Sequence, residues 1–184
     1  MEKSEKIIQS AMKLFIEHGV QATPMSAIAK AADTGMGTIY NYFATKEELI
    51  NAIYLHIKHK ETNSLKLPFT DESIKRRFDH FFEALIRYFI NNPLHFRFMD
   101  QFHNSPILTP DTKEKGMQAM ETVITVISKG QEQGILKQIG LDELLYFLEG
   151  GLMGFVRWVL SNKIPVTREL IDHQLSIAWD AVKF

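Results

Sequence analysis

The chain has 184 residues, of which 45% are hydrophobic and 23% charged, with a formal net charge of −1. These values are typical of a globular protein with one good core or two small ones. Because the chain contains no cysteine, disulfide bonds, zinc–thiolate sites and thiol nucleophiles are excluded. The N-terminus, MEKSEKIIQS, lacks the apolar run of a secretory signal, so we expect a cytoplasmic protein.

Apolar residues recur with helical spacing along nearly the whole chain, and no segment alternates as a strand would. The predicted fold class is therefore all-α, with about nine helices. A first helix is expected to end at Gly19, since glycine commonly terminates helices. Its predicted inner face carries Ile7, Ala11, Leu14, Phe15 and His18.

Three more helices are predicted in the N-terminal third. A second helix begins at Thr23, whose hydroxyl would cap it, with Pro24 at the first helical position. A short third helix covers about residues 36–43, and a long fourth helix begins at Lys46. Beyond the loop SLKLPFTDES, residues 64–73, the helices become longer and richer in aromatic residues. We therefore divide the chain into a domain of residues 1–60 and a second of residues 61–184, with further helices near 71–90 (its start marked by Thr70), 94–104, 110–132, 141–161 and 167–182.

Residues 24–43 have the pattern of a helix-turn-helix. Ala29 and Ala32 are small enough for a following helix to cross closely, and Asp33 and Gly35 tolerate turn conformations. In the helix after the turn, Ile39 and Phe43 form one apolar stripe and leave the polar and tyrosine side chains outside. The second helix of such a motif enters the DNA major groove.

The residue types in this helix suit DNA. Gly37 permits close approach of the backbone, and Thr38 and Asn41 can bond base edges. A tyrosine hydroxyl can reach phosphate oxygens, and Lys46 is well placed for a further phosphate. Charge is a weaker indicator, because residues 1–60 carry seven Lys and Arg residues against six Asp and Glu residues. A purely structural three-helix bundle is the alternative for this region.

The segments AMKLFIEHG, ATPMSAIAKAA, GTIYNYF and KEELI resemble, in order and spacing, the DNA-binding domain of the tetracycline-repressor (TetR) family. The resemblance implies a helical transcription regulator that pairs as a homodimer and binds a double-stranded DNA operator. In the turn, Asp33, Thr34 and Gly35 stand where the family commonly has glycine, an apolar residue and serine. The predicted DNA-binding residues are Thr23, Met25, Ser26, Met36, Gly37, Thr38, Tyr40, Asn41, Tyr42 and Lys46.

For the second domain the resemblance is one of architecture, so its residues are interpreted directly. Inward faces are predicted for Phe78, Phe82, Phe89, Phe96, Met99, Phe102, Phe147 and Phe155. A packed core is one interpretation of these residues, and a cavity for an apolar or aromatic small-molecule effector is the other. The candidate ligand-binding residues are Phe82, Phe89, Phe96, Arg97, Met99, Gln101 and Phe155. Asp100 and His103 share a helix face, but no third ligand is indicated, so neither a metal nor another cofactor is expected.

The stretch LLYFLEGGLMGFVRWVL, residues 144–160, approaches the length of a membrane span. Because Glu149 and Arg157 interrupt it, we predict a buried or interfacial helix and no membrane association. Three glycines within an apolar helix suggest that another helix crosses closely, either from a second subunit or from the same chain. The predicted dimer interface contains Gly150, Gly151, Gly154, Phe155, Trp158, Leu175 and Trp179.

No nucleophile elbow, phosphate-binding glycine loop or paired-histidine motif is present in the sequence. No catalytic residues are therefore predicted, and the protein is not expected to be an enzyme. We predict a DNA-binding repressor that a small molecule releases from a palindromic operator. The alternative is a helical small-molecule-binding protein that does not bind DNA, or a helical enzyme that uses a buried acid such as Glu149.

Overall fold

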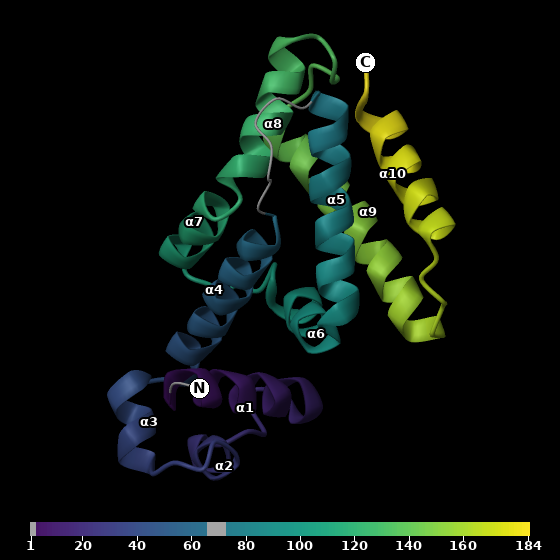
Figure 1. The fold of residues 1–184 in the computed structure, drawn as a ribbon. Coiled ribbons are helices and arrows are strands. Elements are labelled where there is room, and N and C mark those ends of the chain that lie inside the picture. The colour runs from purple at the N-terminus through teal and green to yellow at the C-terminus, as the bar shows by residue number, and fades with distance from the viewer. Residues whose placement is uncertain (1–2, 66–72) are drawn as a thin grey trace. The chain divides into compact units, whose positions relative to one another are not determined.

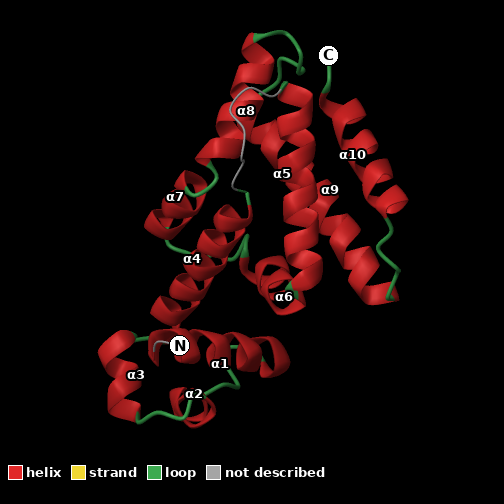
Figure 2. Ribbon diagram, in the orientation of Figure 1, coloured by secondary structure: helices red, strands yellow, loops and turns green. Residues whose placement is uncertain are grey.

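The structure, a computed structural model, describes residues 3–65 and 73–184, and within these ranges the regular elements are all helices (Figures 1 and 2). The predicted all-α class is confirmed. The ten described helices are α1 (Lys3–His18), α2 (Met25–Ala31), α3 (Met36–Tyr42), α4 (Lys46–Ser64), α5 (Ile74–Asn91), α6 (Pro93–Phe102), α7 (Pro110–Gln118), α8 (Glu121–Glu132), α9 (Leu141–Asn162) and α10 (Arg168–Val182).

The helices form two compact units. The first combines Met1–His59 with Leu94–Gln118, and the second combines Lys60–Pro93 with Ala119–Phe184. The first unit thus contains α1–α3, most of α4, α6 and α7, and the second contains α5 and α8–α10. The predicted boundary between residues 60 and 61 separates two functions and stays a prediction. In the structure, residues 94–118 group with the N-terminal helices.

In the first unit, α1 buries one face against α2, and α3 packs on α2 in turn. The buried residues of α1 are Ile7, Ile8, Ala11, Met12 and Phe15. The prediction was wrong for His18, which is exposed, while Leu14 is half-buried. The Gly19 amide donates to the Phe15 carbonyl at 2.9 Å with a φ of +81°, so glycine ends α1 as predicted.

In the second unit, α5 lies at the centre and contacts α8, α9 and α10 (Figure 1). The apolar face of α5 consists of Ile74, Phe78, Phe81, Phe82, Ile86 and Phe89, all buried. Ser73 caps this helix, because its hydroxyl accepts from the Arg76 amide at 3.3 Å. The predicted start signal, Thr70, lies outside the described residues.

The single helix predicted over residues 110–132 is two helices, α7 and α8. The break falls at Ala119 and Met120, and Met120 has φ −98° and ψ 7°. The Thr62 hydroxyl, distant in sequence, donates to the Ala119 carbonyl at 2.8 Å. A tertiary hydrogen bond thus engages a backbone acceptor that a continuous helix would use internally.

By length and composition alone, α9 is the one helix in the described part of the chain that could cross a membrane. One of its faces, with Leu144, Leu148, Leu152, Val156 and Val159, is buried. It packs against α5 and α10. A core helix of a globular protein has this same character.

Candidate functional site

The turn between α2 and α3 forms without the glycine that usually occupies it. Asp33 has a left-handed φ of +51°. Its amide donates to the Lys30 carbonyl at 3.2 Å, and the Thr34 amide donates to the Ala29 carbonyl at 3.0 Å. These are the two hydrogen bonds of a Schellman motif, and aspartate is one of the few residues besides glycine that adopt this conformation. The turn therefore closes α2 and starts α3 two residues later.

Helix α3 divides into a buried stripe and an exposed face. Ile39 is fully buried and Phe43, directly after the helix, is 9% exposed, as their spacing predicted. On the other side Tyr40 and Tyr42 are each about half exposed. The remaining predicted DNA-binding residues of this region are also accessible: Ser26, Met36, Gly37 and Asn41 are exposed and Thr38 is half-buried. The helix thus presents two phenols, an amide and a hydroxyl on one short surface.

Two of the predicted DNA-binding residues are buried and do not belong to this exposed surface. Thr23 is 2% exposed, and its hydroxyl donates to the Gly19 carbonyl at 2.8 Å, so it neither caps α2 nor faces solvent. Pro24 occupies the N-cap position of α2 instead. Met25 is 8% exposed and belongs to the core between the helices. Helical spacing places Met25 on the inner face of α2 together with Ile28 and Ala29. Burial of Thr23 instead follows from the tight connection between α1 and α2, which the sequence pattern did not show.

The start of α4 is fixed by side chains that the sequence analysis missed. The Glu48 amide donates to the Thr45 hydroxyl at 3.1 Å, and the Ala44 amide donates to the Glu48 carboxylate at 2.8 Å. Threonine followed three residues later by glutamate is the signature of a capping box, but here the glutamate accepts from Ala44, the residue before the N-cap, instead of from the N-cap amide. Lys46 donates from Nζ to the Val20 carbonyl at 3.0 Å and so ties α4 to the loop after α1. A phosphate contact by Lys46 remains a prediction.

Comparison with known families assigns both parts of the chain. The sequence profile described as "Bacterial regulatory proteins, tetR family" matches residues 7–53, and "Tetracyclin repressor-like, C-terminal domain" matches residues 54–184. The chain belongs to the TetR family. It is a DNA-binding transcriptional regulator. That the exposed face of α3 is its recognition surface, as in other helix-turn-helix proteins, stays a prediction.

Individual relatives agree with this assignment. The transcriptional regulator YhgD of Bacillus subtilis is 27% identical over 141 residues, which cover 73% of this chain and 70% of that protein. The transcriptional repressor Rv3405c of Mycobacterium tuberculosis is 31% identical over 86 residues, 47% of this chain and 46% of that protein. This TetR-family chain thus spans about half of the mycobacterial relative that it matches.

Solved structures share the fold of this TetR-family protein. A tetR family transcription regulator from Shewanella superposes with a TM-score of 0.92 at 19% identity, and the superposition covers 100% of each chain. Another from Marinobacter aquaeolei has a TM-score of 0.89 at 23% identity, covering 98% of this chain and 95% of that one. At these identities the likeness shows the fold alone.

The rings predicted to line an effector cavity are packed core in this regulator. In the second unit Phe82, Phe89 and Phe155 are at most 9% exposed, and Phe82 stacks on Phe78 with centroids 5.7 Å apart. In the first unit Phe96 and Met99 are at most 3% exposed. The predicted polar anchors, Arg97 and Gln101, are exposed instead. Phe147, predicted to face inward, is 57% exposed.

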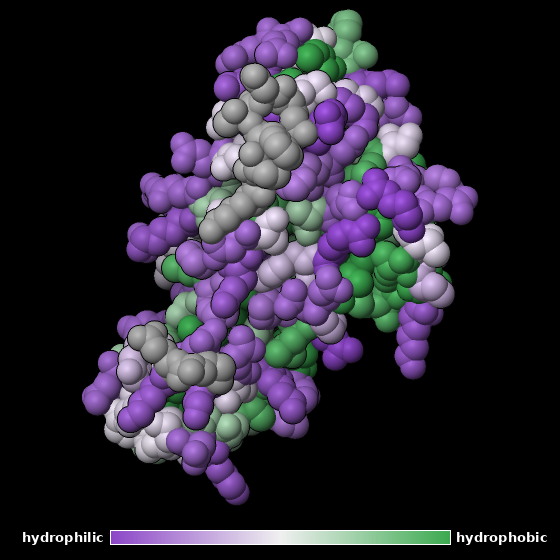
Figure 3. Space-filling view, in the orientation of Figure 1, coloured by the Kyte–Doolittle hydropathy of each residue, from purple (hydrophilic) through white to green (hydrophobic). Residues whose placement is uncertain are grey.

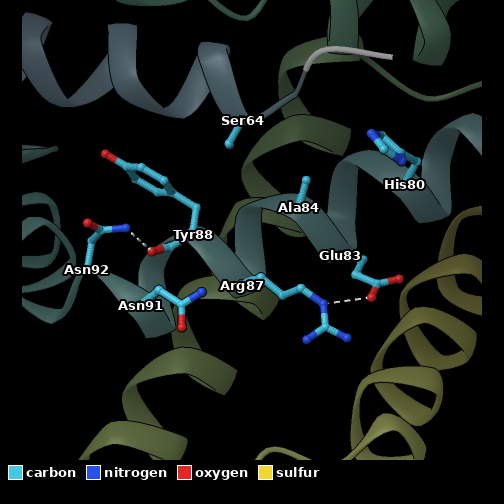
Figure 4. A pocket seen from close by; sticks show the side chains of 8 residues that line it. All are labelled: Ser64, His80, Glu83, Ala84, Arg87, Tyr88, Asn91 and Asn92. Atoms are coloured by element: carbon cyan, nitrogen blue, oxygen red, sulfur yellow. Dashed lines mark hydrogen bonds and ion pairs between the residues drawn. The ribbon is translucent and has the colours of Figure 1, made fainter. Parts of the chain in front are cut away.

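The second unit has an open groove of about 550 Å³ along one face of α5. Figure 4 shows its lining, which consists of Ser64, His80, Glu83, Ala84, Arg87, Tyr88, Asn91 and Asn92. Arg87 donates from Nε to Glu83 at 2.7 Å, and Arg168 of α10 bonds the same carboxylate at 2.9 Å. Burial, and then the charge of Glu61, raises the pKa of Tyr88. The phenol is therefore neutral and able to donate a hydrogen bond at physiological pH.

Asp100 and His103, the pair considered as metal ligands, lie in different environments. His103 stacks on Tyr54 with ring centroids 6.5 Å apart, and Asp100 is exposed. Within residues 3–65 and 73–184, no three His, Cys, Asp or Glu side chains gather as a metal site would require.

The predicted dimer residues fall into two groups. Phe155 and Leu175 are buried within the chain, and Trp179 packs on Phe78 at 5.3 Å under the ammonium of Lys75. All three pack within the second unit, where Trp179 is half-buried, and their role in a dimer interface stays a prediction. The other four, Gly150, Gly151, Gly154 and Trp158, share the outer face of α9.

Proposed function

We propose that this regulator is a cytoplasmic homodimeric repressor that binds a palindromic operator and is released by a small molecule. The accessible polar and tyrosine face of α3 supports the operator contact. The mycobacterial relative, named a transcriptional repressor, supports the direction of regulation. The proposal assigns no catalytic role to any residue. A two-fold symmetric operator implies two recognition helices related by a dimer axis.

The main support for a dimer comes from the glycines on the outer face of α9. Apart from neighbouring residues and the backbone of the same helix, a Cβ atom added at Gly150, Gly151 or Gly154 would meet no atom of the described residues within 4 Å. Their φ angles also lie outside the left-handed region. Each glycine costs about 1 kcal/mol relative to alanine in a helix interior, and no contact among the described residues requires it. Close approach of the same helix from a second copy supplies the missing reason.

Large apolar side chains flank these glycines. Phe147 is 57% exposed and Trp158 is 46% exposed, while Ile177 on α10 is 61% exposed. An apolar patch lies over α9 beside α10 in the space-filling view (Figure 3). Exposed apolar surface of this kind marks interaction sites, and the symmetry of the operator favours a second copy as its occupant.

The α5 groove is a candidate effector site. Its volume suits a small organic molecule, and its lining offers a neutral phenol, an amide and a guanidinium. These groups favour an effector with hydrogen-bonding substituents over the purely apolar molecule that the aromatic residues suggested. The effector would lower operator affinity only through a difference in its affinity for the DNA-bound and free conformations.

Titration of a palindromic fragment from the gene's own upstream region, at two salt concentrations, tests the proposal. Tight binding that depends on sequence and weakens with salt is expected. Binding that does not distinguish the palindrome from a scrambled duplex would contradict operator recognition. Sedimentation of the free protein tests the dimer separately.

A further inference from the structure

Asn51, on the second turn of α4, makes three hydrogen bonds. Its Nδ2 donates to the Glu47 carbonyl at 2.7 Å and to the Ile107 carbonyl at 3.0 Å. Its Oδ1 accepts from the Thr109 amide at 3.0 Å. Ile107 and Thr109 lie in the connection between α6 and α7, so one side chain joins α4 to a segment more than fifty residues away in sequence.

The geometry fixes the orientation of this amide. Exchanging its oxygen and nitrogen would place an oxygen against two carbonyls and an NH₂ group against the Thr109 N–H. The side chain is 8% exposed, so water does not readily replace these bonds. Asparagine is also a poor helix former, which argues that its position within α4 serves this tertiary contact.

The segment held by Asn51 continues directly into α7. The Thr109 hydroxyl accepts from the Thr112 amide at 3.2 Å and so caps α7. One turn further along α4, Tyr54 lies so close to α7 that a Cβ atom at Gly116 would be 2.7 Å from the phenol oxygen. Helix α7 thus rests on α4 at two successive turns.

The first turn of α4, just before Asn51, is held by bonds to the segments around it. Glu48 bonds Ala44 and Thr45 in the α3–α4 connection. Lys46 bonds the Val20 carbonyl in the loop after α1. A continuous set of contacts therefore runs from the α3–α4 connection through the first turns of α4 to residues 107–116. All these residues belong to the first compact unit.

We infer that Asn51 is a positioning residue that makes residues 94–118 move with the DNA-binding helices as one body. The chain leaves this body between His59 and Lys60, Pro93 and Leu94, and Gln118 and Ala119. A change in α4 on DNA binding is transmitted through Asn51 to the α6–α7 connection. The inference requires DNA binding by this chain and does not depend on the proposed effector.

Hydrogen exchange tests this transmission. The probe is a duplex that the wild-type protein selects from a random-sequence pool, added at a saturating concentration to wild type and to Asn51→Leu. In the wild type, DNA should slow exchange both in α3 and in a peptide covering residues 103–113, the latter by at least about threefold. In Asn51→Leu the slowing in α3 should persist while that in residues 103–113 is lost. Asn63→Leu, the same replacement at an exposed position of α4, serves as the matched control and should behave as wild type.

Two results would overturn the inference: no DNA-dependent slowing at residues 103–113 in the wild type, or the same slowing in Asn51→Leu. If circular dichroism shows that Asn51→Leu does not fold, Asn51→Asp replaces it. Its carboxylate still accepts from Thr109 but cannot donate to Ile107, so the slowing should fall between wild type and none. Slowing at the full wild-type level in Asn51→Asp would contradict a role for the donated bonds.

Discussion

Replacing Gly37 by alanine separates the stability of the recognition helix from its contact with DNA. Gly37 is the second residue of α3 and its φ lies outside the left-handed region. An added Cβ atom would meet nothing within 4 Å. The folded chain therefore gives no steric or conformational reason for glycine at this position.

The magnitude follows from helix propensity. Glycine in a helix interior costs about 0.8–1.0 kcal/mol relative to alanine, and somewhat less in the first turn. Gly37→Ala should therefore raise the free energy of unfolding by roughly 0.5 kcal/mol. If Gly37 instead permits close approach to DNA, the same methyl group should weaken operator binding by about tenfold, equivalent to about 1.4 kcal/mol. The two effects have opposite signs.

Urea denaturation followed by circular dichroism measures the first effect, and fluorescence anisotropy with a labelled operator measures the second. Ser10→Ala on α1 is the control, since it also improves helix propensity but lies outside the predicted interface. It should gain a few tenths of a kcal/mol and leave operator affinity unchanged. A Gly37→Ala protein that is more stable and binds the operator as wild type would refute the role of Gly37 in close approach.

Three further predictions concern the turn, the start of α4 and the dimer face. Asp33→Gly should raise the free energy of unfolding by up to about 1 kcal/mol, because glycine adopts the left-handed conformation without strain; a lower thermal midpoint would instead reveal a stabilising role for the carboxylate. Lys46→Ala should lower the slope of log affinity against log salt by about 0.9 and, by leaving the Val20 carbonyl without this donor, cost about 0.5–1.5 kcal/mol of stability. Stability loss with an unchanged slope would assign Lys46 to the fold alone. Gly154→Leu should give folded monomers in sedimentation, because a Cβ atom at this position meets no described side chain within 4 Å, whereas a closely facing helix would clash with the added side chain; a mutant that remained dimeric would move the interface elsewhere.

The sequence determined the elements whose apolar residues recur on a single face. The stripe of Ile39 and Phe43 in the recognition helix is one example, and the phenylalanine face of α5 is another. In such helices local spacing and burial coincide, because one face alone is apolar enough to enter the core. The order and spacing of the motifs in residues 7–54 likewise identified the family, since these residues are close in sequence and fold into one compact group of helices.

Tertiary structure decided what local spacing leaves open. Helix α9 is apolar nearly all round, so its pattern did not show that Leu152 is buried while Phe147 and Trp158 are exposed. The Thr23 hydroxyl could have capped α2 by accepting from an amide of its first turn, but Pro24 takes the N-cap position and the hydroxyl instead donates to the Gly19 carbonyl. The break between α7 and α8 coincides with a hydrogen bond from Thr62, 57 residues away. These outcomes depend on the three-dimensional path of the chain, which brings particular groups within hydrogen-bond or packing distance, and the residue pattern of a single helix does not specify that path.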